Sequence, residues 1–267
     1  MVLEHLELGD FKAEYAILTG NPKRVEQLAK QFHEPVLVTD RRGLDTWHAK
    51  FAADDPRELF IVGTGIGSPS LAIVFEELAV SGVHSFIRVG TCGPLQDHVG
   101  VGDIAVPTGV VRDEGTTLAF IREGYPAVAN HELLYALMQV KENVDHPIHI
   151  GVTHAKDSFY TQKPEFNLDQ DAVRKHWKNM RNAGVLVTEM ESSALYVLAS
   201  LRRCRAMSVL VVASMDRKNP KTAHGLDVAA GVARDVFKIA APYKVPSNYH
   251  FPRVDESLLD DLMEGKF

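Results

Sequence analysis

The sequence predicts an α/β fold built as a single domain. Short runs rich in β-branched residues alternate along the chain with longer segments whose apolar residues recur at helical spacing. Several of the short runs, such as Leu59–Val62, are apolar throughout, which is typical of central strands covered by helices on both faces of a sheet. With 267 residues, the chain is long enough to form one large domain with a substantial core.

The elements follow from these two periodicities. The expected strands are Tyr15–Leu18, Val36–Thr39, Leu59–Val62, Ser85–Val89, Asp103–Val106, His149–Thr153, Val185–Thr188 and Val209–Ala213. The expected helices are Lys23–Gln31, Pro69–Ser81, Glu132–Asn143, Leu168–Asn182, Glu191–Leu201 and Ala223–Ile239. The second of these helices illustrates the pattern, because Leu71, Val74, Phe75 and Leu78 lie at positions i, i+3, i+4 and i+7 of one face.

A change of composition near Pro242 divides the chain. Residues 1–241 form the expected domain, and residues 242–267 form a C-terminal extension with a short acidic helix. In this helix Leu258, Leu259 and Leu262 lie at helical spacing, which favours docking on the main domain or on a partner chain. A frayed tail is the alternative.

Composition excludes several classes of protein. Acidic residues outnumber basic ones by 35 to 29, for a formal net charge of −6, whereas nucleic-acid binding depends on clustered positive charge. Cys92 and Cys204 form no C-x-x-C pair, which argues against a zinc finger or a disulfide framework. Because we find neither a run long enough for a membrane span nor a secretory signal, we expect no membrane partner, no nucleic-acid partner and a cytoplasmic location.

Two glycine-rich turns follow strands and open helices. In Thr19–Arg24, Gly20 allows close approach of the backbone, the helix start offers free N–H donors, and Arg24 adds a forked donor, so an anion fits there. Such turns are also common in α/β proteins for structural reasons alone. Gly63–Ser70 resembles the dinucleotide fingerprint G-x-G-x-x-G with its spacing wrong by one residue, which favours a turn approaching a small ligand over a nicotinamide site.

An arginine and two glutamates lie near the ends of other strands. Arg88 stands in the apolar strand Phe86–Val89 and is costly to bury without an anionic partner. That partner is either a core carboxylate or a phosphate bound with the help of Thr91. Glu189 and Glu191 are two residues apart at a strand end, so both carboxylates are expected on one side of the chain. They can bind sugar hydroxyls, or they can simply favour the N-terminus of the following helix.

In this order, the segments resemble the nucleoside phosphorylase-I family, and its uridine phosphorylases most closely. The similarity runs from His5 to about Ile239. Its motifs are Gly20–Arg24, Gly63–Ser70 followed by Phe75–Leu78, Arg88–Gly93, Gly102-Asp103, Tyr125–Val128, Asp157–Tyr160 and Glu189–Ser192. The resemblance implies a central mixed, largely parallel sheet flanked by helices. It also implies a pentosyltransferase that cleaves uridine with phosphate to give uracil and ribose 1-phosphate.

The same resemblance implies a phosphate site. Gly20, Arg24, Arg88 and Thr91 match the phosphate-binding positions, and Arg42 matches the arginine that a neighbouring subunit supplies. Three arginines around a phosphate dianion neutralise it and hold it under the sugar. Phosphate is a co-substrate, and no cofactor is expected. No metal is expected either, because Gly43 stands where some relatives carry an acidic residue that helps to bind a monovalent cation.

The nucleoside site is implied in the same way. The matching positions are His5, Phe159, Gln162, Glu189, Met190, Glu191, Asp216 and Arg217. Glu191 is expected to accept hydrogen bonds from the ribose, and Arg217 to stabilise the pyrimidine carbonyl, so that Arg88, Glu191 and Arg217 are the expected catalytic residues. His5 matches the residue that reaches the 5′-hydroxyl from a partner subunit. The protein is therefore expected to self-associate as a dimer, or as a hexamer built from dimers, with shared active sites.

The base pocket departs from the uridine phosphorylase pattern. Gln162 follows Phe159 after a loop that is one residue shorter, and no arginine follows it. Asp216 keeps a purine nucleoside phosphorylase open, because purine-cleaving relatives use an aspartate near this strand end to protonate the base. A hydrolytic nucleosidase is disfavoured because water needs no cage of arginines. Retention of Arg88 and Glu191 argues against a non-catalytic nucleoside-binding protein.

Overall fold

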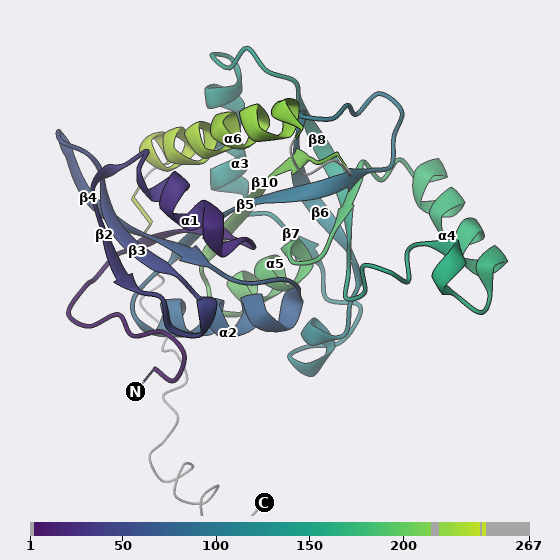
Figure 1. Cartoon of the computed structure of the whole chain (residues 1–267), viewed down its shortest axis with the longest axis horizontal. Helices are drawn as coiled ribbons and strands as arrows, with labels where there is room; N and C mark the ends of the chain where they lie inside the picture. Colours follow the sequence, from purple (N-terminus) through teal and green to yellow (C-terminus); the bar gives the residue numbers. More distant parts are fainter. Residues whose placement is uncertain (1–2, 215–218, 241, 244–267) are drawn as a thin grey trace, which may run out of the picture.

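A single mixed sheet of ten strands organises the part of the chain that the computed structural model describes, residues 3–214, 219–240 and 242–243 (Figure 1). The strands are β1 (Tyr15–Thr19), β2 (His33–Thr39), β3 (Thr46–Ala52), β4 (Asp55–Gly63), β5 (Ser85–Pro94), β6 (Ile104–Asp113), β7 (Ala127–Val128), β8 (Ile148–Lys156), β9 (Val187–Glu189) and β10 (Arg205–Val212). The helices are α1 (Pro22–Ala29), α2 (Ser68–Val80), α3 (His131–Lys141), α4 (Gln170–Asn182), α5 (Ser192–Leu201) and α6 (Pro220–Ile239).

Part of this sheet closes on itself. Its order is β10-β6-β8-β9-β5-β1-β4-β3-β2, and β10 also pairs with β5, so that β5, β10, β6, β8 and β9 form a ring. Pairing is parallel across β4-β1-β5-β10 and across β6-β8-β9. It is antiparallel where β9 joins β5, where β10 joins β6, and at the outer strands β3 and β2. The predicted mixed sheet is confirmed, and its closure into a ring is an additional finding.

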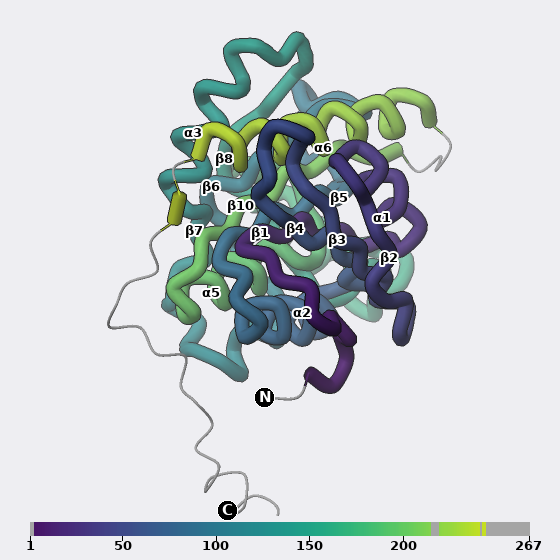
Figure 2. The backbone as a smooth tube through the Cα atoms, turned by 90° about the vertical axis from the view of Figure 1, so that its left-hand side faces the viewer, coloured from purple at the N-terminus to yellow at the C-terminus, as the bar shows by residue number. Residues whose placement is uncertain are grey.

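Helices cover both faces of the sheet. Helices α1 and α6 lie on one face, and α2 and α5 on the other, as Figures 1 and 2 show from two directions. The side chains of β1 alternate accordingly: Tyr15 and Ile17 pack with the first group, and Ala16 and Leu18 with the second. Leu59 and Phe60 of β4 divide in the same way. This two-sided burial explains why the central strands are apolar throughout.

A smaller apolar cluster fills the inner side of the ring. Its buried members are Cys92, Val99, Ala105, Val187, Leu210 and Val212, contributed mainly by β5, β6, β9 and β10. On β10, Val209 packs against the helical layer and its neighbour Leu210 against this inner cluster. Burial raises the pKa of the Cys92 thiol, so this cysteine remains protonated and acts as a packing residue.

Each strand and helix expected within residues 1–241 is present, with its ends displaced by up to seven residues. Two strands were not expected. In β3, Trp47, His48 and Lys50 interrupt the apolar pattern, and β7 has only two residues. The expected acidic C-terminal helix lies outside the described residues. Within the described ranges, no helix is long and apolar enough to cross a membrane.

The contact between α6 and the strand beneath it gives a packing prediction. A Cβ atom on Gly225 would lie 2.4 Å from the carbonyl oxygen of Gly102 and 2.7 Å from Cγ1 of Val211, whereas one on Gly231 would meet nothing within 4 Å. Gly225→Ala should therefore lower the free energy of unfolding by about 1–3 kcal/mol. Gly231→Ala should raise it by up to about 1 kcal/mol, because alanine is favoured over glycine inside a helix. Urea unfolding followed by circular dichroism measures both, and equal effects would contradict this packing.

Candidate active site

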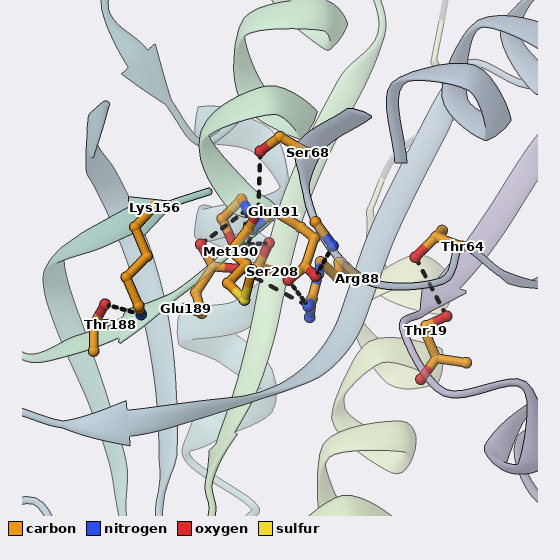
Figure 3. A network of polar contacts seen from close by, with 12 residues as sticks. Thr19, Thr64, Ser68, Arg88, Lys156, Thr188, Glu189, Met190, Glu191 and Ser208 are labelled. Atoms are coloured by element: carbon orange, nitrogen blue, oxygen red, sulfur yellow. Dashed lines mark hydrogen bonds and ion pairs between the residues drawn. The ribbon is translucent and has the colours of Figure 1, made fainter. Parts of the chain in front are cut away.

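Several segments far apart in the sequence meet at one edge of the sheet. Strands β1 and β4 run parallel to β5, and the turns that follow them, at Gly20 and at Gly63–Ser68, lie at the same edge as Arg88. Strand β9 runs antiparallel to the end of β5 and brings Glu189 and Glu191 back toward this edge. Figure 3 shows the side chains of Arg88, Glu189 and Glu191 close together.

The centre of the site is a buried cluster of one arginine and two glutamates. The Nη2 atom of Arg88 donates a hydrogen bond to Oε2 of Glu191 and lies 3.9 Å from Oε2 of Glu189. The Gly67 N–H donates to Glu191 at 2.6 Å, and the N–H groups of Glu191 and Ser192 donate to Glu189 at 2.9 and 3.0 Å. Burial by itself lowers the pKa of Arg88, but the two carboxylates raise it overall, so the guanidinium keeps its charge. Burial raises the pKa of Glu189.

This arginine has donors that the protein leaves unused. Nε and Nη1 of Arg88 are buried and make no hydrogen bond to any described residue. Arg24 lies close enough for the charge of Arg88 to lower its pKa, in addition to the lowering that burial causes. A Cβ atom on Gly90 would overlap the guanidinium of Arg88, so only glycine fits beneath it. Two neighbouring cations, of which Arg88 has unpaired buried donors, form a site that a dianion can stabilise.

Gly20 borders the guanidinium of Arg88, and Thr91 follows Arg88 on β5. A Cβ atom on Gly20 would lie 4.0 Å from Nη2 of Arg88 and 3.1 Å from the carbonyl oxygen of Gly65. The Thr91 side chain is half-buried, and its hydroxyl forms no hydrogen bond within the described residues. The structure therefore gathers Gly20, Arg24 and Arg88 in one chain, with Thr91 three residues beyond Arg88 on the same strand.

Two predicted site residues lie away from the cluster. Nδ1 of His5 is 2.7 Å from Oε1 of Glu77, which is nine residues along α2 from Ser68, about 13 Å of helix rise. Arg42 is exposed in a 3-10 turn after β2, the outermost strand of the sheet. A single chain thus does not bring either residue to Arg88, and the cross-subunit roles that the resemblance implies for them remain predictions.

The residues expected around the base lie in the loop between β8 and α4. Phe159, Tyr160 and Phe166 surround the Lys163 Nζ atom at 5.6, 5.8 and 5.9 Å from their ring centroids. Phe159 is 43% exposed, so its face is available to a ligand or to another chain. Gln162 lines a cavity of about 430 Å³ to which neither Arg88 nor Glu191 contributes. Asp216 and Arg217 lie outside the described residues.

Two polar residues of this edge were missed by the sequence analysis. The Ser68 hydroxyl donates to the carbonyl of Met190 at 2.9 Å and holds the half-buried methionine beside the glutamates. Lys156 is buried, its Nζ donates to Oγ1 of Thr188 at 2.7 Å, and burial lowers its pKa to about 8 against the attraction of Glu189 (Figure 3). Lys156 opens the polar run that precedes Phe159, but only the pairing of β8 with β9 shows that it points toward the site.

Together, the fold and the anion site beside two buried carboxylates define an α/β transferase of the nucleoside phosphorylase type. Residues 14–242 match the profile of the Phosphorylase superfamily, and the chain belongs to this family. It is an enzyme of the pentosyltransferase class, and the predicted resemblance is confirmed.

Relatives with assigned activities are similar over most of the chain. The uridine phosphorylase of Escherichia coli K12 is 36% identical over 198 residues, which cover 73% of this chain and 77% of the relative. The guanosine phosphorylase of Halorubrum lacusprofundi is 36% identical over 207 residues, which cover 78% of this chain and 80% of the relative. The crystal structure of uridine phosphorylase from Vibrio fischeri ES114 superposes with a TM-score of 0.75 at 30% identity, covering 84% of this chain and 92% of that one.

The contact at His5 leads to a prediction about the N-terminal segment. The Glu77 carboxylate accepts the His5 N–H at 3.0 Å and the Leu6 N–H at 2.7 Å. Although burial raises the pKa of Glu77, the bonds from the His5 ring and from these N–H groups lower it overall. Glu77→Gln should reduce the free energy of unfolding by about 1–3 kcal/mol and speed exchange of both amides. Hydrogen exchange measures this, with Glu76→Gln as the control, since Glu76 pairs with Arg202 instead.

The same contact should depend on pH. Because the pKa of Glu77 is lower in the folded chain than in the unfolded one, its contribution to stability is present above the unfolded pKa and is lost as the pH falls through the folded pKa. Acid should therefore reproduce the effect of Glu77→Gln in the wild type and leave the variant less affected. Equal exchange of the His5 and Leu6 amides in wild type and Glu77→Gln at neutral pH would contradict the anchoring role.

Proposed function

We propose that the protein catalyses the phosphorolysis of uridine, producing uracil and ribose 1-phosphate. The observation that carries the proposal is Arg88, a buried charged guanidinium next to Arg24 that Glu191 holds in place. Its Nε and Nη1 atoms have no partner in the part of the chain that the structure describes. A site with two cations and free donors supports an anionic co-substrate, which a hydrolase acting with water does not need. The uridine phosphorylases among the relatives support the choice of reaction.

In the proposed mechanism, phosphate binds to Arg24 and Arg88 and to the hydroxyl of Thr91. The Gly20 turn, which has no side chain to block the approach, adds backbone donors from the start of α1. Two guanidiniums neutralise most of the charge of the dianion and fix one of its oxygens toward the sugar. Positioning of the two reactants is then the main source of rate enhancement.

The glutamates hold the ribose. Glu191 is anchored by Arg88 and by the Gly67 N–H, and each carboxylate oxygen retains a lone pair that can accept a ribose hydroxyl. As the phosphate oxygen bonds to C1′, the glycosidic bond breaks and its electron pair leaves with the base. The developing positive charge of the sugar lies near the carboxylates of Glu189 and Glu191, which stabilise it. Met190 packs against the sugar.

The identity of the base rests on the loop after β8 and on residues outside the described part of the chain. Phe159 offers an exposed ring for stacking, and Gln162 offers an amide that can pair with the edge of uracil. We assign Arg217 to the departing pyrimidine carbonyl. A guanosine or other purine nucleoside is the second candidate, because a guanosine phosphorylase is among the relatives and Asp216 could protonate a purine at N7.

The reaction and the phosphate site can be tested together. Uridine, thymidine, inosine and guanosine are incubated with the enzyme with and without phosphate, and released base and pentose 1-phosphate are measured. Uridine cleavage should require phosphate, and kcat/KM should be greatest for uridine. Arg24→Gln should raise the KM for phosphate roughly tenfold to 100-fold, because a hydrogen bond to a charged group contributes about 1.5–3 kcal/mol.

The control for this experiment is Lys23→Gln, an exposed neighbour on the same turn of α1. It should leave the KM for phosphate almost unchanged, which separates a local contact from general loss of positive charge. Base release at the same rate without phosphate would replace phosphorolysis by hydrolysis. A phosphate-dependent preference for guanosine or inosine that Asp216→Asn removes would establish the purine alternative.

We also propose that the active site is shared between subunits of a dimer, or of a hexamer built from dimers. Support comes from the position of His5 and Arg42, which lie away from Arg88 in their own chain although both match ligand-binding positions of the family.

Shared sites can be detected by mixing inactive variants. Chains carrying His5→Ala and chains carrying Glu191→Gln should regain part of the activity when their subunits exchange, because one site of each mixed dimer then has both residues intact. The control mixture is Glu189→Gln with Glu191→Gln, whose changes fall in the same chain's cluster and should not complement each other. Subunit exchange verified by mass spectrometry without recovery of activity would refute the shared site.

A further inference from the structure

A second polar cluster lies outside the Arg88 site, between α4 and the carboxyl ends of β6 and β8. Asp113 ends β6, His154 lies in β8, and His176 lies in α4. One potential ligand atom of each residue lies within 4.8 Å of those of the other two. Oδ2 of Asp113 is 3.1 Å from Nε2 of His154 and 3.8 Å from Nε2 of His176. Figure 1 shows α4 at the side of the molecule, and the ring centroids of His154 and His176 are 5.4 Å apart.

The His154 ring is held in one orientation. Its side chain is fully buried and packs edge-on against Trp177, with ring centroids 5.1 Å apart. Nδ1 lies 3.1 Å from Oγ1 of Thr188, the in-register neighbour on β9. When Nδ1–H donates to Thr188, Nε2 carries the lone pair that a metal requires.

The His176 ring has a buried nitrogen atom without a hydrogen-bond partner among the described residues. The bond between His154 and Asp113 accounts for those two residues without any ligand. Nε2 of His176, however, is buried without a hydrogen bond to any described residue, and 3.8 Å from Asp113 is too long for one. A cation bound among the three residues would satisfy this nitrogen, and it would replace the proton that Nε2 of His154 otherwise shares with Asp113.

The cluster also opens onto a cavity. Asp113 and His176 belong to the lining of the cavity of about 430 Å³, together with Asp157, Ser158 and Trp177. A cation there can exchange with solvent and keep a coordination position for water. Two imidazoles and one carboxylate are the donor set that zinc prefers, whereas magnesium and calcium take oxygen ligands. Three protein ligands with an open position are typical of zinc sites that also bind a water molecule.

We propose that Asp113, His154 and His176 bind a zinc-type divalent cation, which ties α4 to β6 and β8. This site is separate from the Arg88 cluster and does not depend on the proposed reaction. It goes against the sequence-based expectation of no metal, an expectation that concerned a monovalent cation near Gly43. The segment between His154 and His176 includes the loop with Phe159 and Gln162, so the cation would restrain both ends of that loop.

The test is direct binding of metal to the full-length protein. After treatment with a chelator and buffer exchange, the protein is titrated with Zn²⁺ in equilibrium dialysis and with Co²⁺ in visible spectroscopy. We expect one Zn²⁺ to bind per chain and the Tm to rise with Zn²⁺ concentration. The visible spectrum of bound Co²⁺ should be that of an ion with a low coordination number. Mg²⁺ should show no comparable binding. Asp113→Asn and His176→Gln should each weaken Zn²⁺ binding by more than about 100-fold, beyond the loss typical of residues that only orient a ligand.

A control variant and a check of folding distinguish loss of the metal site from loss of the fold. Asp113 and His176 are partly exposed, so their substitution should leave the fold intact, which far-UV circular dichroism verifies. His149→Gln is the control, because His149 pairs with Asp103 at 2.8 Å at the opposite ends of β6 and β8. It should bind Zn²⁺ as the wild type does. Failure of the wild type to bind Zn²⁺ at micromolar concentration, or equal binding by Asp113→Asn/His176→Gln, would overturn the proposal, whatever the nucleoside specificity.

Discussion

The buried contact of Arg88 with Glu191 and Glu189 is the interaction on which the rest of the site depends. A guanidinium that is 3% exposed would be strongly destabilising without these carboxylates, and the carboxylates would be equally costly without it. The contact with Glu191 uses one nitrogen of the arginine, and its other two have no hydrogen-bond partner among the described residues. The protein thus holds a positive charge in place, away from water, with donors still available for an anion.

The fold makes this contact possible through strand direction. Because β9 runs antiparallel to the end of β5, residues about 100 positions apart return to one edge, where the turn after β4 adds the Gly67 N–H. Glu189 is held in turn by backbone N–H groups at the start of α5. The arginines and the glutamates of the site therefore lie on or next to strands and helices, which are rigid elements. The loop that carries Phe159 is more exposed than these elements.

Much of the fold was predictable, because it follows from local patterns. The apolar runs at β1, β4 and β10 reflect burial on both faces, and the helices have apolar stripes at the expected spacing. Strand β3 was missed since its polar residues hide the alternation. The structure brings Gly20, Arg24, Arg88 and the two glutamates together, and the roles that the resemblance implies for them remain predictions. Ser68 lies in the glycine-rich motif and Lys156 opens the polar run before Phe159, but neither signal predicted the contacts of these residues, and the cluster of Asp113 with two histidines gave no local signal.

The sequence by itself determined the α/β class, the family, and the residue types available for an anion and a sugar, because periodicity and short motifs are properties of neighbouring residues. Only the tertiary structure decided that the sheet closes into a ring, that Arg88 retains free donors, and that His5 and Arg42 lie away from the cluster of their own chain. It also brought Asp113 to His154 and His176. These features depend on strand order and register, which bring together residues that no local pattern connects.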